Sequence, residues 1–184
     1  MKDYALIAHR AGAAQAAAAA IAVRVAPGAS PASVRFEYRL RGVLGELAIP
    51  RRASPRRAER LWEHTCFEAF VASAVGDGYY ELNFSPSTEW ATYEFDAYRH
   101  GMRPLELATP PSVAVAETAS ELTVTADVEF PGVAAARCPW RIGLSAVVEA
   151  RAGGRAYFAL RHPRENPDFH DAAGFVVMLD GSAR

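Results

Sequence analysis

The sequence predicts an all-β protein, an antiparallel β-sandwich of about eleven short strands with one short helix. Short runs of β-branched and aromatic residues recur about every ten residues, and several alternate apolar with polar side chains. Turn-forming groups such as "APGASP", "GDG", "TPPS" and "HPRENP" separate these runs. Long helical periodicity is missing. Together these observations favour two packed layers of strands.

We interpret the alanine-rich segment 13–23 as a linker that runs into the first expected strand. The stretch "VRFEYRLRG" puts apolar residues on one face and charged residues on the other, and "ELTVTADVEF" repeats the scheme, as half-buried strands do. Near the C-terminus, "ARAGGR" indicates a hairpin between two strands. The expected strands are Ile21–Val25, Ser33–Leu40, Glu46–Ile49, Thr65–Ala72, Tyr79–Phe84, Trp90–Tyr98, Ser112–Ala116, Glu121–Phe130, Trp140–Glu149, Arg155–Leu160 and Phe175–Leu179.

The short helix is expected at Ser54–Leu61. Ser54 can cap its first turn, and Pro55 suits the first helical position. This region, "RRASPRRAER", carries five arginines in ten residues. We interpret it as a solvated surface, with an anion or nucleic-acid patch as the alternative. No aromatic residues are interleaved there to stack on bases.

The composition is that of one soluble domain that spans residues 1–184, with its core at about 18–180. Of the 184 residues 51% are hydrophobic, and the formal net charge of −1 creates no general attraction for nucleic acid or acidic membranes. No apolar run reaches the length of a membrane span. Cys66 and Cys138 form no C-x-x-C pair, so free thiols in the cytoplasm are expected. A periplasmic or secreted protein is the alternative, because residues 13–23 resemble the apolar part of a signal peptide.

Polar residues gather on two neighbouring central strands. In a strand at 65–72, Glu68 lies on the face opposite the core, and in a strand at 79–84, Glu81 and Asn83 do the same. Trp62 and Trp90 stand at the entrances of the first and third central strands. Tryptophan rings that flank carboxylate and amide groups suit a sugar, which stacks its C–H faces and pairs its hydroxyls. The alternative is that both tryptophans are core or rim residues and the polar row is merely solvated.

Catalytic alternatives remain open at this stage. His64, Cys66 and Glu68 occupy alternate positions and could ligate a metal, as in a metal-dependent enzyme. Glu63 could pair with Glu68 or Glu81 for glycoside hydrolysis. Phosphate-binding glycine loops, G-x-S-x-G and H-E-x-x-H are all absent. We therefore expect no enzymatic activity.

Three stretches together resemble the bacterial DOMON-like domain proteins, which are related to DOMON domains and to family-nine carbohydrate-binding modules. They are "LWEHTCFEAFV", "YYELNFSPSTEWATYEFDAYRHGM" and "PDFHDAAGFVVML". The resemblance implies an immunoglobulin-like or jelly-roll β-sandwich that binds a small ligand, sugar or haem, without chemistry of its own. It implies that Trp62 stacks on a sugar. By position in the motif, it also implies a pocket lined by Glu63, Glu68, Tyr80 and Asn83.

The function expected from these arguments is non-catalytic binding of a small molecule, a carbohydrate or similar polyhydroxy ligand. A haem-binding electron-transfer domain is the alternative, although a clearly placed Met–His axial pair is lacking and Met102 with His170 or His64 is the only choice. No nucleic-acid or membrane partner and no other cofactor is expected. The predicted ligand-binding residues are Trp62, Glu63, Glu68, Tyr80, Glu81, Asn83, Trp90 and His170.

Overall fold

The protein is all-β, as predicted. The computed structural model describes residues 3–12, 19–30, 32–73, 76–130 and 139–179, and within them every strand pairing is antiparallel and the only helices are short 3-10 turns. The strands are β1 (Asp3–Ala8), β2 (Ala20–Pro27), β3 (Ser33–Arg41), β4 (Cys66–Ser73), β5 (Tyr79–Phe84), β6 (Trp90–Phe95), β7 (Arg103–Pro104), β8 (Ser112–Glu117), β9 (Glu121–Glu129), β10 (Trp140–Glu149), β11 (Arg155–Ala159) and β12 (Val177–Leu179). The 3-10 turns are η1 (Leu44–Glu46), η2 (Leu61–Glu63) and η3 (Ala172–Gly174).

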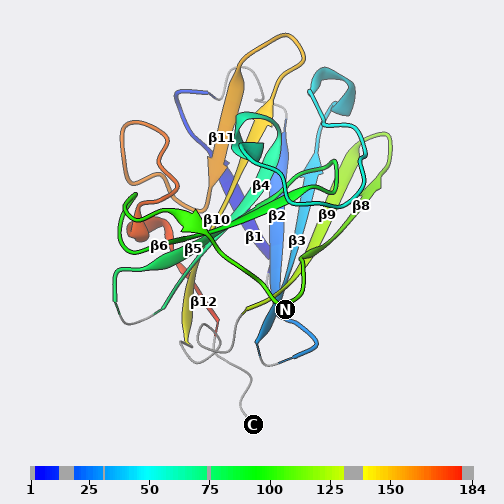
Figure 1. The fold of residues 1–184 in the computed structure, drawn as a ribbon. Coiled ribbons are helices and arrows are strands. Elements are labelled where there is room, and N and C mark those ends of the chain that lie inside the picture. The colour runs from blue at the N-terminus through cyan, green and yellow to red at the C-terminus, as the bar shows by residue number, and fades with distance from the viewer. Residues whose placement is uncertain (1–2, 13–18, 31, 74–75, 131–138, 180–184) are drawn as a thin grey trace.

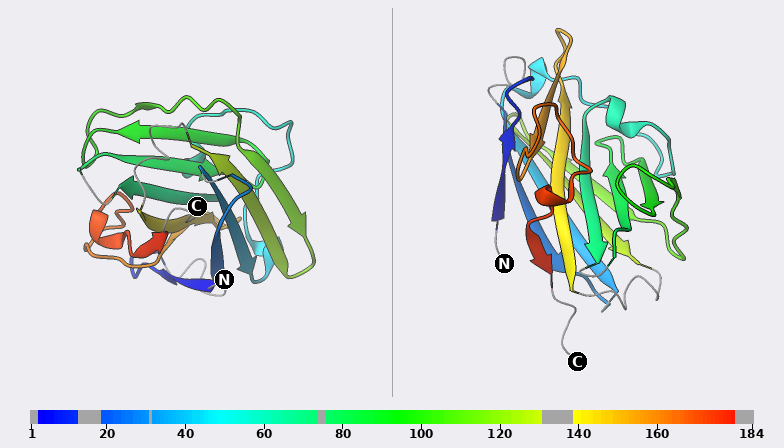
Figure 2. Two further views of the ribbon diagram at one scale, coloured as in Figure 1. Left: turned by 90° about the horizontal axis from the view of Figure 1, so that it is seen from below. Right: turned by 90° about the vertical axis from the view of Figure 1, so that its left-hand side faces the viewer.

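The strands form one sheet that curls so that its two halves face each other (Figures 1 and 2). Its order is β7-β6-β5-β4-β10-β11-β1-β2-β3-β9-β8, and β12 pairs with β10. Strand β1 joins the halves: its residues 3–6 pair with β2, whereas Ile7 and Ala8 pair with β11. The hairpins expected between β4 and β5 and between β10 and β11 are both formed.

The main core lies between the two halves. Alternate residues of β3 and β9 point inward from one half, and alternate residues of β4, β5 and β10 point inward from the other. Phe36 lies 6.0 Å from Phe84, and Tyr38 lies 5.1 Å from Phe67, between ring centroids. All four side chains are fully buried, and each such aromatic contributes roughly 1.5–3 kcal/mol by its removal from water.

A second apolar cluster covers the outer face of β4, β5 and β6. It contains Cys66, Phe70, Tyr79 and Phe95, and it is closed by side chains from segments 58–62 and 169–175, which pack over these strands. In Figure 1 the orange-to-red segment that carries η3 lies beside them. Both faces of these strands are therefore buried, and a polar group on the outer face is withdrawn from solvent.

Two predicted elements are absent. The helix expected at 54–61 does not form, because the segment runs along β6: Arg57 bridges to Trp90, and its guanidinium donates to the carbonyls of Thr92 and Leu105 at 3.0 and 2.8 Å. These tertiary hydrogen bonds outweigh a weak helical preference. The strand expected at 46–49 is reduced to a single bridge from Leu47.

Other features were missed or lie outside the described residues. Strand β1 was not predicted, because it precedes the alanine-rich segment that the first strand was expected to follow, and β7 is too short to leave a pattern. Cys66 is a free, buried thiol, whereas Cys138 lies outside the described residues. Within the described ranges, no helix has the length and apolar character needed to cross a bilayer.

Replacing Tyr38 by Phe is expected to lower the free energy of unfolding by about 1–2 kcal/mol. The fully buried Tyr38 hydroxyl donates to the Glu68 carbonyl at 2.6 Å and so ties the two halves of the sheet together. Urea unfolding monitored by fluorescence measures the change. Tyr80→Phe is the matched control, because the Tyr80 hydroxyl forms no hydrogen bond among the described residues. Equal losses in the two variants would contradict the prediction.

Candidate functional site

A cavity of about 390 Å³ lies on the outer face of the β4–β5–β10 region. Strands contribute its floor, and the loops after β6 and β11 contribute its rim. Its volume is in the range of small-molecule sites. The lining residues are Trp62, Glu68, Phe70, Glu81, Phe95, Arg99, Met102, Val147, Arg155, Tyr157, Pro167, Phe169 and His170.

Two buried carboxyl groups form part of the floor. The β4–β5 register pairs Glu68 with Asn83 and Phe70 with Glu81, so both glutamates project from the same face. Only 2% of Glu68 and 6% of Glu81 is exposed. Asn83 Nδ2 donates to Glu81 Oε1 at 2.8 Å, and Ser145 Oγ donates to Glu68 Oε2 at 3.3 Å. Neither carboxylate has a lysine or arginine within ion-pair distance among the residues that the structure describes.

Burial controls the ionisation of this pair. Desolvation raises the pKa of Glu68 well above its usual value, and the charge of nearby Glu81 raises it further. Desolvation also raises the pKa of Glu81, against the hydrogen bond from Asn83 and the charge of Arg99. Two carboxyl groups that share a dry site resist simultaneous ionisation. The floor can therefore donate as well as accept hydrogen bonds.

His170 stands beside the carboxyl pair. Its Nδ1 lies 2.7 Å from the Tyr79 hydroxyl, and its Nε2 lies 3.7 Å from Glu81 Oε2. The Tyr79 oxygen already accepts the backbone N–H of Arg99 at 3.1 Å, so its own proton is available for Nδ1. Burial, with the charge of Arg99, lowers the pKa of His170 from 6.5 to about 4. The imidazole is therefore neutral at pH 7.

Local contacts hold the loop that carries His170. Asp168 accepts from Arg99 Nη2 at 3.0 Å and from the backbone N–H of His170 at 3.1 Å. Desolvation raises the pKa of Asp168, but the hydrogen bonds from Tyr98, Arg99 and the His170 backbone outweigh it and lower the pKa below its usual value. Asp171 accepts from the Ala173 N–H at 2.9 Å and so caps η3. The two aspartates organise the loop, as capping residues would.

Aromatic side chains form the walls of the cavity. They are Trp62, Phe95, Tyr157 and Phe169, together with Phe70 at the base. Trp62 is half-buried and meets Tyr93 edge-on at 5.8 Å, and Tyr157 lies 6.2 Å from Phe169. The cavity thus combines ring faces with buried hydrogen-bonding groups.

The structure places the predicted residues in four different settings. Trp62, Glu68, Glu81 and His170 line the cavity, and Asn83 supports Glu81 from the neighbouring strand position. This convergence follows from the two-residue period of β4 and β5.

The expectation that two tryptophans flank the cavity was wrong. Tyr80 and Trp90 lie on the strand face opposite to the one that carries Glu81 and Asn83, and both point into the main core. Glu63 also lies away from the cavity, where it accepts from Arg60 Nε at 3.0 Å. Sequence reasoning missed Val147 and Tyr157, because β10 and β11 are distant in the chain and only sheet pairing brings them to β4.

The alternatives of a metal site and of a haem site find no support among the described residues. Within the described ranges, no group of three or more His, Cys, Asp and Glu could hold a metal ion. His64, Cys66 and Glu68 do not converge: His64 is exposed and its Nδ1 pairs with Glu149 at 2.9 Å. Met102 and His170 do line one cavity, but His170 Nδ1 is already hydrogen-bonded to Tyr79 at 2.7 Å and Nε2 faces the buried Glu81 carboxyl at 3.7 Å, so an iron at Nε2 would have to displace that carboxyl.

Comparisons with known proteins support the fold. No family model and no curated protein matches the sequence. Among solved structures, the chain is similar to a proposed carbohydrate-binding protein from Bacteroides uniformis, with a TM-score of 0.67 and 14% identity. The match covers 96% of this chain and 84% of that one. At this identity the likeness concerns the β-fold alone.

Proposed function

We propose that this protein binds a small polyhydroxy ligand, a carbohydrate, in the 390 Å³ cavity and does no chemistry on it. The observation that carries the proposal is the pairing of aromatic walls with two buried carboxyl groups that have no lysine or arginine within ion-pair distance in the described part of the chain. A sugar uses both kinds of surface, because its C–H face stacks on a ring and its hydroxyls donate to and accept from carboxyl and imidazole groups.

The resemblance to DOMON-like domain proteins supports the same proposal. The third stretch that carries the resemblance is distant in sequence from the first two, yet all three supply residues to this cavity: Trp62 and Glu68 from the first, Glu81 and Phe95 from the second, and His170 from the third. The fold is also shared with a proposed carbohydrate-binding protein. We therefore place the chain with the DOMON-like proteins as part of this proposal.

Trp62→Ala is expected to weaken sugar binding about tenfold, because a stacking ring at a half-buried site contributes about 1–1.5 kcal/mol. A glycan array identifies the sugar, and calorimetry then measures affinities, which we expect between micromolar and millimolar. Trp62→Phe is the matched control and keeps most of the affinity. The proposal is wrong if no glycan binds, or if Trp62→Ala binds as tightly as the unmodified protein.

A hydrolytic role for the carboxyl pair is tested in parallel. Glycosidases use two carboxyl groups that flank the scissile bond, and one of them must stay ionised. Here desolvation raises the pKa of both Glu68 and Glu81, so ionising either carboxyl costs more than it would in water, and we propose that the pair binds a sugar without cleaving it. Prolonged incubation of the protein with the glycan that it binds should release no product. If the unmodified protein releases product and the Glu68→Gln variant does not, the non-catalytic part of the proposal is wrong.

A further inference from the structure

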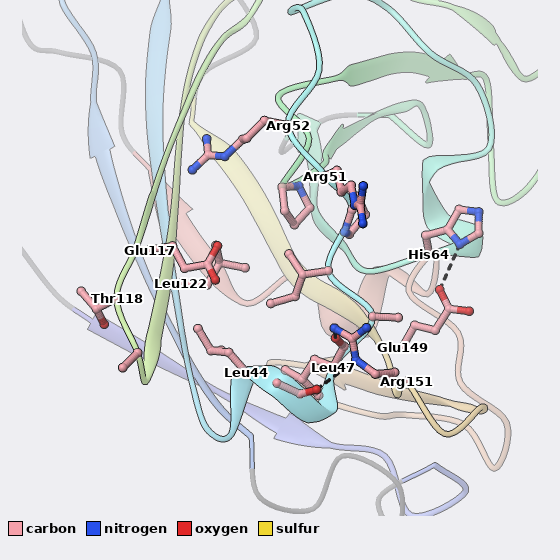
Figure 3. A pocket seen from close by; sticks show the side chains of 16 residues that line it. Leu44, Leu47, Arg51, Arg52, His64, Glu117, Thr118, Leu122, Glu149 and Arg151 are labelled. Atoms are coloured by element: carbon pink, nitrogen blue, oxygen red, sulfur yellow. Dashed lines mark hydrogen bonds and ion pairs between the residues drawn. The ribbon is translucent and has the colours of Figure 1, made fainter.

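A second cavity, of about 790 Å³, shares no lining residue with the first (Figure 3). It lies where η1, the segment 47–52, the β8–β9 turn and the end of β10 meet. In Figure 3 the side chains of Arg51 and Arg151 lie on one side of the cavity, and those of Glu117 and Leu122 lie on the other. It is open to solvent along this rim of charged residues.

The base of this second cavity is apolar. Leu44 and Leu47 are 6% and 5% exposed, and Leu122 is fully buried. Ile49 and Pro86 extend the apolar surface. The leucines belong to the main core as well, so they form a firm surface that does not need a ligand to be held in place. Apolar atoms of a ligand would gain about 25 cal/mol for each square ångström that they withdraw from water here.

The arginines of segment 51–60 divide into two groups. Arg56, Arg57 and Arg60 each form an ion pair with a glutamate. Arg51 and Arg52 form none with any described residue, and both line the second cavity. The two arginines of this segment that form no ion pair with a described residue are thus the two that line the second cavity.

A third unpaired guanidinium comes from the β10–β11 hairpin. Arg151 Nε donates to the Gly45 carbonyl at 3.0 Å, and Arg52 Nη2 donates to the Val115 carbonyl at 2.6 Å. These backbone carbonyls orient the two side chains without neutralising them. Arg51 makes no side-chain hydrogen bond with any residue that the structure describes, so its donors remain available. Guanidinium groups bind the paired oxygens of carboxylates and phosphates.

Two carboxylates belong to the same lining, and they do not cancel the three arginines. Glu149 is occupied by His64 Nδ1 at 2.9 Å, and Figure 3 shows His64 turned toward it. Glu117, on the opposite side, has no ion pair with any described residue. The cavity therefore has Arg51 and Arg151 on one side, Glu117 across from them with Arg52 reaching to the same strand, and an apolar base.

We propose that this second cavity binds a small amphiphilic anion, an apolar body that carries one carboxylate or phosphate group. The apolar body rests on Leu44, Leu47 and Leu122, and the oxyanion lies between Arg51 and Arg151. This site is independent of the carbohydrate cavity, because the two have no residue in common.

Four eight-carbon probes with different head groups test the class of ligand: octanoate, octyl phosphate, 1-octanol and octylamine. Binding is followed by calorimetry and by chemical-shift changes in the folded protein. Octanoate and octyl phosphate are expected to bind at least about tenfold more tightly than octanol, as a charge-assisted hydrogen bond predicts, and octylamine more weakly still. The preference should shrink at high salt, because the rim is exposed. Which of the two anions binds more tightly identifies the preferred head group.

Three variants locate the site. Arg51→Gln should weaken octanoate binding about tenfold, and Glu117→Gln should strengthen it, since it removes the opposing charge. Arg161→Gln is the matched control: it removes the same charge from an exposed arginine that lines neither cavity, and it should leave binding unchanged. All three side chains are exposed, so folding is expected to persist and is checked by thermal unfolding.

Three results would overturn the proposal. The first is no octanoate or octyl phosphate binding at millimolar concentration. The second is equal binding of octanol, which would leave no role for the arginines. The third is equal weakening by Arg51→Gln and Arg161→Gln, which would assign the effect to general surface charge. A saturating carbohydrate in the first cavity should not alter octanoate affinity, so failure of one site leaves the other untouched.

Discussion

Glu68→Gln is expected to have a larger unfolding free energy than the unmodified protein at pH 8. Below about pH 4.5 the unfolding free energies of the two proteins should change with pH in the same way. Burial raises the pKa of Glu68 above its usual value of 4.5, so the folded state holds the proton more tightly than the unfolded chain does. Stability from that proton is complete below pH 4.5 and is lost as pH rises through the folded pKa. The loss reaches about 1.4 kcal/mol for each unit of pKa shift.

Urea unfolding of both proteins between pH 4 and pH 9 measures this difference. The gap in unfolding free energy should widen steadily as pH rises above 4.5. Glu149→Gln removes a carboxylate from a partly exposed position beside His64 and is the matched control for loss of a glutamate. If the unfolding free energies of Glu68→Gln and the unmodified protein change in parallel with pH, burial does not raise the pKa of Glu68 and the prediction is wrong.

His170→Gln is expected to remove a loss of stability that the unmodified protein suffers as the pH falls, whereas Glu68→Gln removes one that appears as the pH rises. The pKa of His170 falls from 6.5 to about 4 on folding, so the unfolded chain takes up a proton first as pH drops. The unmodified protein should therefore lose about 3 kcal/mol between pH 6.5 and pH 4, a loss that a glutamine at this position does not suffer. His170→Gln also loses packing energy, which lowers its unfolding free energy equally at every pH. The difference in unfolding free energy between the two proteins should therefore be smaller at pH 4 than at pH 7.5 by about 3 kcal/mol.

The ring environment of His170 explains the size of this effect. Phe70 and Phe95 lie 5.1 and 5.2 Å from the imidazole, and they exclude the water that would solvate a cation. His100→Gln, at an exposed position, serves as the control for loss of a histidine. If proton resonances of the His170 ring titrate near pH 6.5, the aromatic enclosure does not dehydrate the ring.

The central face illustrates what local pattern can and cannot predict. The two-residue period of a strand is a property of the backbone, so Glu68, Glu81 and Asn83 were placed on one face from sequence alone. The same period, with the correct parity, turns Trp90 and Tyr80 toward the core. The error arose because Trp90 was assigned from its place at a strand entrance and Tyr80 from its position in the family motif, rather than by strand alternation.

The segment 51–60 shows a different limit. Ser54 and Pro55 supply valid helix-start signals, yet the chain runs extended because Arg57 finds backbone carbonyls on and beside β6. Sequence likewise cannot show which arginines find a carboxylate. That distinction separates Arg56, which pairs with Glu89 at 2.7 Å, from Arg51, which faces the second cavity.

The sequence by itself determined that this chain is a β-sheet protein, where most strands begin and end, and which central polar residues share a face. Each of these depends on side-chain alternation and turn chemistry over a few neighbouring residues. Only the tertiary structure decided that the outer face of β4 and β5 is covered, so that its glutamates are dry, and that β10 and β11 complete its cavity. Those outcomes depend on contacts between segments far apart in the chain, whose pairing is selected by packing and desolvation rather than by any local pattern.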